Sequence, residues 1–538
     1  MDILISALKN EINKYSKVAI YGCGKFAEET YLALCKCGRE PSFCVVTQKS
    51  DTPILFKNAI PIYNLSEQAT VIKEENILVI VGVSSLYEKQ IEETLKEYQI
   101  KQYLLISSFE RLEVYKRFSP QECMEEIVQW YIDKYSDEVA GLDRQSVLKE
   151  LNEAIKREKN SKKIVFAMGA LTPRVLKVAD ALLEKGYQIK LIANSVAVMQ
   201  DFCEAGLKKL NLSYVKCETL EEFLYQIIME NSKVIHLFTN ISNSHIDRIL
   251  IKNKELFSPI VYDEYDIYNL CYEGLSQGLL KNERFCLENA DGVCNRGYEI
   301  NYLIENGFRI GKGTIQFHDY CSNKPLNLVE HSFTQEENDE VSLCYIGGML
   351  QKSQSAEWAD NIFECARRCA ENHCHFHVYP HRWDEVQLKD YIELEKTNDY
   401  FHLHHPVSYD ELKSELSKYD YGIFPIRKAY VNQGIPFVDG AVYKKEQLLY
   451  ATGNKYFDYL DAGLPIIAAC PQKLMQFLGT KDVVLNWTVE EYDFEEIKNR
   501  RRELKKNVVR EHYGLQMRQH INELTNLYDF VENERNKS

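Results

Sequence analysis

The chain has 538 residues, which at about 100–200 residues per domain predicts roughly three domains, and its apolar fraction of 45% is sufficient for packed cores. The formal charge of −15 argues against a general nucleic-acid-binding protein, which would carry a basic face, so no nucleic-acid partner is expected. No secretory signal and no bilayer-spanning apolar run of roughly 20 residues is present, which predicts a cytoplasmic protein, at most in peripheral contact with the inner face of a membrane.

Short β-rich apolar runs alternate with amphipathic helix-length segments, which predicts α/β domains with parallel sheets. The first block, residues 1–115, has a strand at Lys17-Val-Ala-Ile-Tyr followed by Gly22-Cys-Gly-Lys-Phe-Ala, the spacing of a dinucleotide-binding turn. The second strand, Cys44-Val-Val-Thr-Gln, lacks the final acid that would hold the ribose of NAD. We expect an additional Rossmann-like accessory domain; assembly into a homo-oligomer, nucleotide-sugar binding and redox chemistry stay open as its role.

Two further α/β blocks follow a predicted helical connector at residues 116–160, which is rich in Glu, Lys and Gln. The second block, residues 161–338, ends in an acidic stretch that is typical of a linker, and the third covers residues 339–511. Residues 512–538 are predicted to contain a final helix. Two consecutive doubly wound domains would enclose a cleft, with strand ends and helix N-termini facing a ligand.

The most informative segment is Gly453-Asn-Lys-Tyr-Phe-Asp-Tyr-Leu-Asp-Ala-Gly-Leu-Pro-Ile-Ile, which predicts a helix that stops at Gly463 before a strand. Asn454, Lys455 and Asp458 lie together at the start of this helix. A lysine ammonium can hold a diphosphate, and a carboxylate can accept hydrogen bonds from both ribose hydroxyls. A structural helix cap is the alternative interpretation.

This segment resembles the donor-binding helix of GT-B glycosyltransferases, in the large retaining class that includes sucrose-phosphate and bacterial surface-polysaccharide sugar transferases. Those proteins commonly show the pattern N-K-x-x-E-Y-x-x-x-G-x-P, and Asp458 stands at the position of its ribose-binding glutamate. Ala290-Asp-Gly-Val-Cys-Asn-Arg, Tyr345-Ile-Gly-Gly-Met-Leu and Ser408-Tyr-Asp-Glu-Leu resemble other family segments in the same order. The resemblance covers about residues 162–534.

The resemblance implies an α/β fold in which two doubly wound Rossmann-like domains form a GT-B cleft. Residues 161–338 would hold the acceptor, residues 339–511 the nucleotide-sugar donor, and the final helix would cross back to the acceptor domain. It implies a metal-independent hexosyltransferase that needs no cofactor and moves a sugar from a nucleotide-diphosphate sugar to a sugar, lipid-linked or protein acceptor, in surface polysaccharide or glycoconjugate synthesis. A nucleotide-sugar epimerase of the same fold, or a non-catalytic binding or scaffold protein, stays open.

The resemblance also implies the residues of the site. Donor binding is assigned to Gly347, Gly348, Lys352, Arg382, Thr452, Gly453, Asn454, Lys455 and Asp458, with Lys455 as the strongest candidate for the diphosphate. Asp263, Asp266 and His236 are the catalytic candidates, and Gly169 and Glu264 lie on the acceptor side. The carboxylates could instead cap a helix, and His236 could be a buried histidine with its hydrogen bonds satisfied. Tyr450 and Gly348 replace a carboxylate and an arginine of many relatives, which is why the scaffold alternative is kept.

Metal binding is not expected. The 16 cysteines form no CxxC pair and are predicted to be reduced thiols. Histidines recur at positions 373, 375, 377, 402, 404 and 405, but no Cys or carboxylate spacing completes a tetrahedral set with them.

Overall fold

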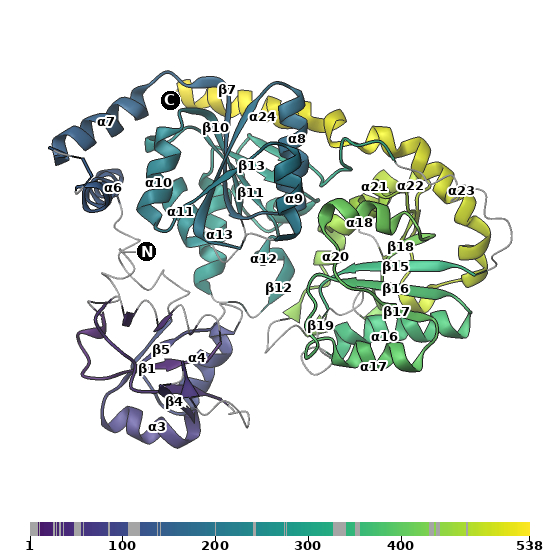
Figure 1. The fold of residues 1–538 in the computed structure, drawn as a ribbon, viewed down its shortest axis with the longest axis horizontal. Helices are drawn as coiled ribbons and strands as arrows, with labels where there is room; N and C mark the ends of the chain where they lie inside the picture. The colour runs from purple at the N-terminus through teal and green to yellow at the C-terminus, as the bar shows by residue number, and fades with distance from the viewer. Residues whose placement is uncertain are drawn as a thin grey trace.

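The computed structural model describes residues 9–537 except 10, 25–26, 28–29, 32–33, 36, 48–54, 58, 84–86, 106–118, 137, 140, 199–200, 240–243, 274, 276, 327–339, 350–355, 430–434, 437–441 and 470–471. These described residues form three domains, each built on a mainly parallel sheet (Figure 1). Most of the predicted acidic linker, and Lys352, lie outside the described residues.

The N-terminal domain is a six-stranded sheet of order β3-β4-β2-β1-β5-β6, parallel except for the β3–β4 pair. Its elements are β1 (Val18–Tyr21), β2 (Cys44–Val46), β3 (Leu55–Phe56), β4 (Ile60–Asn64), α3 (Leu65–Glu74), β5 (Leu78–Val81), α4 (Glu88–Glu97) and β6 (Tyr103–Leu105). Gly22 follows β1 with φ +113°, and a Cβ there would lie 2.8 Å from the Gly82 carbonyl oxygen. This turn requires glycine, because both the backbone angle and the neighbouring strand disfavour a side chain.

The connector forms two helices, α6 (Pro120–Tyr135) and α7 (Arg144–Lys156). Ser119 and Glu122 make a reciprocal capping box at the start of α6, and the Asp143 side chain caps α7. The apolar sides of both helices share a core with the second domain, in which Ile127 and Leu151 are fully buried. The connector therefore packs as part of the second domain.

The second domain is a seven-stranded parallel sheet of order β14-β13-β11-β10-β7-β8-β9. Its strands are β7 (Asn160–Ala170), β8 (Gln188–Val198), β9 (Tyr214–Lys216), β10 (Ser232–Thr239), β11 (Ile260–Glu264), β13 (Gly292–Asn295) and β14 (Thr314–Gln316). Its helices include α8 (Pro173–Glu184), α9 (Asp201–Lys209), α10 (Leu220–Met229), α11 (Ser244–Lys252), α12 (Tyr268–Cys271), α13 (Gln277–Asn289) and α14 (Glu299–Glu305). Later strands are added on both sides of β7, so the domain is doubly wound.

The third domain is a six-stranded parallel sheet of order β17-β16-β15-β18-β21-β22. Its strands are β15 (Ser342–Gly347), β16 (His375–Pro380), β17 (Phe401–Leu403), β18 (Tyr421–Phe424), β21 (Ile466–Ala468) and β22 (Val484–Leu485). Its helices include α16 (Ala356–Glu371), α17 (Lys389–Thr397), α18 (Tyr409–Leu416), α20 (Gln447–Tyr450), α21 (Asn454–Asp461) and α22 (Gln472–Gly479). A small antiparallel sheet joins β12 (Tyr272–Glu273) of the second domain to β20 (Val442–Tyr443) and β19 (Ile435–Pro436).

Two long helices close the chain, α23 (Phe494–His512) and α24 (Met517–Lys537). Figure 1 shows α24, in yellow, running from the third domain along the second. Leu527 and Val531 of α24 lie so close to β13 that a Cβ on Gly292 would meet both side chains. The α/β fold class is confirmed, and α24 connects the two larger domains. No helix in the described part of the chain has the length and apolarity that a membrane span requires.

Candidate functional site

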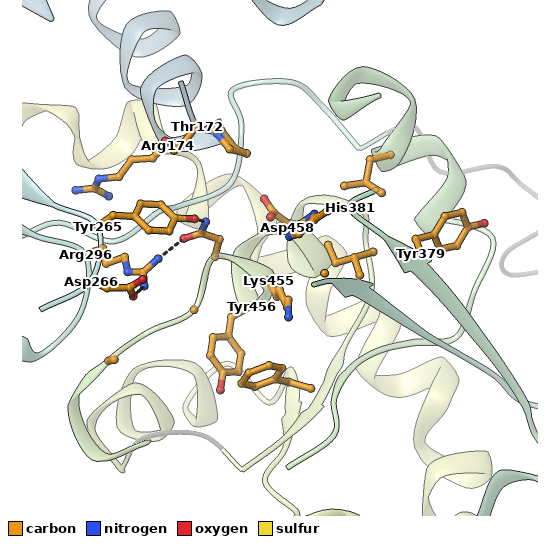
Figure 2. Close-up of a pocket in the computed structure, with 18 of the residues that line it drawn as sticks. Thr172, Arg174, Tyr265, Asp266, Arg296, Tyr379, His381, Lys455, Tyr456 and Asp458 are labelled. Carbon is orange, nitrogen blue, oxygen red and sulfur yellow. Dashed lines mark hydrogen bonds and ion pairs between the residues drawn. The ribbon is translucent and has the colours of Figure 1, made fainter. Parts of the chain in front are cut away.

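A cavity of about 530 Å³ lies between the second and third domains, at the carboxyl ends of their strands (Figure 2). This volume is within the usual range for small-molecule sites. From the second domain, its lining includes residues that follow or end β7, β10, β11 and β13: Thr172, Pro173, Arg174, Thr239, Asp263, Tyr265, Asp266 and Arg296. From the third domain, it includes residues at the ends of β15 and β16 and at the start of α21: Ile346, Gly347, Tyr379, Pro380, His381, Gly453, Asn454, Lys455, Tyr456 and Asp458.

Lys455 lines this cavity from the first turn of α21. Its Nζ donates to the Tyr345 hydroxyl at 3.0 Å and lies 4.4 Å and 4.7 Å from the ring centres of Tyr345 and Phe424. Among the described residues, no carboxylate lies within ion-pair distance of this amine. An ammonium that has aromatic and hydroxyl neighbours but no counterion favours an anionic ligand.

Gly347, the last residue of β15, lies against Lys455. Its φ is +146°, and a Cβ built on it would stand 2.5 Å from Lys455 Nζ. Glycine is required here, because a side chain would be strained and would displace the amine. The structure therefore brings together two of the predicted donor-binding residues, although they lie far apart in the sequence.

The N-terminus of α21 also opens on the cavity. Gly453 is its N-cap, so no side chain of the N-cap residue satisfies the first backbone N–H groups of the helix. Asn454 accepts a hydrogen bond from Arg296 Nη1 at 2.8 Å, and its amide nitrogen contacts the Tyr265 hydroxyl. Thr452 is buried, and its hydroxyl donates to the Arg296 carbonyl at 2.8 Å, so it joins the two domains instead of facing a ligand.

Asp458 lies one turn further along α21 and lines the cavity (Figure 2). Its Oδ1 accepts from Lys177 Nζ of α8 at 2.8 Å, which makes an ion pair between the two domains. The Lys177 side chain is almost fully buried, whereas that of Asp458 is 12% exposed. Burial raises the pKa of Asp458, and the nearby Lys177 ammonium opposes that rise. The carboxylate thus has one oxygen engaged by the second domain.

A buried network surrounds Asp263, at the end of β11. Its carboxylate accepts from Arg174 Nε and His236 Nε2, both at 3.0 Å, and Arg174 Nη1 also donates to Asp319 at 2.8 Å. His236 Nδ1 lies 2.6 Å from the Tyr528 hydroxyl of α24. Burial would raise the pKa of Asp263, but Arg174 and His236 outweigh it and hold the pKa below its ordinary value. Asp263 is therefore a charged group with its hydrogen-bonding capacity occupied, a poor general base.

Asp266 and Arg296 form an ion pair at the second-domain side of the cavity. The guanidinium also lies 4.2 Å from the ring centre of Tyr265. The Asp266 side chain is 28% exposed, in contrast to the fully buried Asp263. Both predicted catalytic carboxylates line the cavity, and Asp266 is the more accessible of the two.

Several predicted site residues lie elsewhere. In the described part of the chain, the lining of the cavity does not include Gly169, His236, Glu264, Gly348, Arg382 or Thr452. Gly169 lies inside strand β7 and is buried, and Arg382 is exposed next to the lining residue His381. Glu264 accepts from the Tyr262 hydroxyl at 2.9 Å, and burial and the neighbouring Glu283 raise its pKa well above the ordinary value. The side chains of His236 and Glu264 are therefore buried and hydrogen-bonded within the protein.

Two buried clusters combine residue types that bind metals. Their members are His236, Asp263 and Cys294 in the first, and Cys321, Asp461 and His512 in the second. A protein cation already contacts each carboxylate: Arg174 donates to Asp263, and Lys413 donates to Asp461 at 3.1 Å. Because a second cation there would be repelled, both clusters are better described as ion-pair networks.

Sequence reasoning missed Arg174, Lys177 and Arg296. The first two lie three residues apart on α8, so they share a side of the helix that starts after the end of β7. Arg296 stands just after β13, inside one of the segments that resemble the GT-B family. The available signal was the position of these cations, which follow the carboxyl ends of two parallel strands of one sheet, β7 and β13.

The second and third domains face each other across this cavity and are joined by a returning helix. The chain has the GT-B fold. No family model matches the chain, and no curated protein matches it.

Solved structures that resemble the chain include sucrose-phosphate synthase from Thermosynechococcus elongatus, with 14% identity, a TM-score of 0.47, and coverage of 68% of this chain and 98% of that one. The pneumococcal O-GlcNAc transferase GtfA, solved with UDP and GlcNAc, has 8% identity, a TM-score of 0.44, and coverage of 69% and 99%. The UDP-GlcNAc 2-epimerase from Neisseria meningitidis, solved with UDP-GlcNAc, has 11% identity, a TM-score of 0.40, and coverage of 68% and 100%. These similarities are distant and carry no information on the activity of this chain.

Proposed function

We propose that the chain is a glycosyltransferase that moves a sugar from a nucleoside-diphosphate sugar to an acceptor hydroxyl, in surface polysaccharide or glycoconjugate synthesis. The observation that carries this proposal is the amine of Lys455, which lines an interdomain cavity and has no carboxylate partner among the described residues. Gly453 leaves the adjacent N-terminus of α21 without a side-chain cap. A cation beside the N-terminus of a helix is an arrangement that favours a diphosphate.

In the proposed reaction the donor lies against the third domain, with its diphosphate at Lys455 and α21. The acceptor oxygen forms a bond to the anomeric carbon as the bond from that carbon to the diphosphate oxygen breaks, and the proton of the acceptor hydroxyl passes to the departing diphosphate. Lys455 and the helix amides stabilise the charge on the departing diphosphate, so the proposed mechanism uses no metal ion. Asp266, the partly exposed carboxylate, is proposed to contact the acceptor hydroxyl, and Asp263 is proposed to stay ionised in its pair with Arg174.

Asp458 is proposed to accept hydrogen bonds from the ribose hydroxyls. Because Lys177 of the second domain already contacts this carboxylate, a nucleotide bound there would touch a group shared by both domains. Donor binding would then stabilise the closed arrangement of the cleft.

The proposal is tested first by thermal unfolding in the presence of UDP, GDP, ADP and CDP. One of these is expected to raise the unfolding temperature, because a ligand that binds only the native state stabilises it. The sugar nucleotide of that base is then incubated with and without candidate acceptors, and release of the nucleoside diphosphate is measured. Release that requires an acceptor supports a transferase. Conversion of the sugar without an acceptor would instead support an epimerase of the same fold, and lack of all nucleotide binding would contradict the donor site and favour a scaffold.

Gly347→Ala is expected to weaken binding of that nucleoside diphosphate about tenfold, which corresponds to one charge-assisted hydrogen bond. The new Cβ would stand only 2.5 Å from Lys455 Nζ and push the amine from its place. Calorimetric titration measures the affinity. Gly311→Ala is the matched control, because nothing lies within 4 Å of its added Cβ and its φ is not in the left-handed region. Equal affinities for Gly347→Ala and the control would disprove the proposed position of the amine.

A further inference from the structure

Four histidines form a ladder on one face of β16 and β17, outside the proposed transfer site. The ladder consists of His375, His377, His402 and His404. None of the four is among the described residues that line the cavity. His377 is in register with His402 across two parallel strands, so alternate residues of both strands share this face. The rings of His377 and His402 stack with centres 4.4 Å apart. The ladder lies at an edge of the sheet, where β17 is the last strand.

The histidines are joined in two pairs by their ring nitrogens. His375 Nδ1 lies 2.8 Å from His402 Nε2, and His377 Nδ1 lies 2.9 Å from His404 Nε2. Two imidazole ligands of one Zn²⁺ ion, each about 2.0–2.1 Å from the metal, stand roughly 3.3 Å apart in a tetrahedral site. Each pair would need to open by only about 0.5 Å for an ion to replace the shared proton.

One pair also has the outer partner that metal-binding histidines usually have. The second ring nitrogen of His375, Nε2, lies 3.3 Å from a carboxylate oxygen of Glu340. When Nε2 donates its hydrogen to Glu340, the lone pair of His375 is on Nδ1, facing His402. A carboxylate behind a ligating histidine fixes its tautomer and raises its basicity.

A neutral imidazole offers one ring-nitrogen lone pair, and imidazole ligands suit zinc, copper and nickel ions.

We propose that the histidine ladder is a binding site for a divalent transition-metal ion, held by paired imidazoles of β16 and β17. The bound ion links the edge strand β17 to β16 and takes no part in sugar transfer. The site is independent of the proposed function, because its residues lie outside the cavity.

The experiment uses the full chain with Cys23→Ser and Cys35→Ser, which remove the exposed thiols of the described residues as competing ligands. Calorimetric titration with Zn²⁺ at pH 7.5 measures its affinity. Loss of an imidazole from each pair, in the His402→Gln, His404→Gln variant, is expected to weaken Zn²⁺ binding at least about tenfold. The matched control is His373→Gln, because this exposed histidine contacts the Tyr400 hydroxyl and belongs to neither pair.

Zn²⁺ binding that is lost in the double variant and kept in His373→Gln supports the site. Absence of Zn²⁺ binding to the parent, or an unchanged affinity in the double variant, overturns it. Circular dichroism checks the fold of each variant. If the double variant does not fold, His375→Gln is measured instead, because this side chain is partly exposed and belongs to one of the two pairs. An unchanged Zn²⁺ affinity in His375→Gln would contradict the role of that pair and of Glu340.

Discussion

Lys455→Ala is expected to weaken binding of the selected nucleoside diphosphate about 100-fold, while thermal unfolding of the ligand-free protein changes little. The amine is the cavity cation that lacks a carboxylate partner among the described residues, so its removal takes away the cation proposed to hold the diphosphate. Hydrogen bonds to charged groups contribute about 1.5–3 kcal/mol, and the upper part of that range corresponds to a decrease in affinity of about 100-fold. Calorimetric titration of the purified variant measures the affinity.

The control for this prediction is Lys396→Ala. Lys396 lies on α17 of the same domain, is exposed, and pairs with Glu393 at 2.7 Å. Its removal changes the net charge by the same amount but leaves the cavity intact, so nucleotide affinity should stay the same. If Lys455→Ala also retained the parent affinity, the diphosphate would lie elsewhere and the proposed donor site would be wrong.

Arg174→Met is expected to destabilise the protein by about 3–5 kcal/mol, because it leaves Asp263 and Asp319 buried without their cation. For a domain of this size the unfolding temperature should fall by roughly 10 °C. Differential scanning calorimetry at pH 7 measures the change. Arg367→Met is the matched control: this exposed arginine pairs with Glu364 and Glu371 at the surface, where ion pairs contribute at most about 1 kcal/mol.

The destabilisation in Arg174→Met should shrink as the pH falls from 7 towards 4. In the parent, Arg174 helps to hold the pKa of Asp263 below its ordinary value, so this ion pair stabilises the fold above the pKa of the unfolded state and weakens in acid. Without the guanidinium, burial raises the pKa of the carboxyl, and protonation at lower pH relieves the cost of an unpaired charge. A difference in stability that stays constant over this pH range would contradict the assignment of Arg174 as the counterion.

Part of the third-domain side of the cavity was predictable from the sequence. Gly453, Asn454, Lys455 and Asp458 lie within two turns of one helix, so their relative positions follow from helical geometry once the helix is recognised. Gly347 was predictable from its place at the end of a strand. The partners of these residues were not, because Lys177 reaches Asp458 from a different domain.

The second-domain side of the cavity was less predictable. The neighbouring residues Asp263, Glu264 and Asp266 have the same chemistry in sequence, but alternation along β11 and the turn after it point them to different surroundings. Asp263 faces Arg174, Glu264 is buried beside Tyr262, and Asp266 is partly exposed at the cavity. Local sequence carries no information on which surroundings each residue meets.

Local sequence was enough to establish the α/β class and the helix that presents Lys455, because hydrophobic period, glycine turns and helix spacing are properties of short segments. Contacts between distant residues depend instead on how the chain packs. The Tyr528 hydroxyl reaches His236 because α24 packs on the second domain, and the histidine pairs exist because β16 and β17 lie in one particular register. A shift of one residue in that register would turn the histidines of one strand to the other face of the sheet, so their pairing requires the strands to be placed correctly as well as spaced correctly.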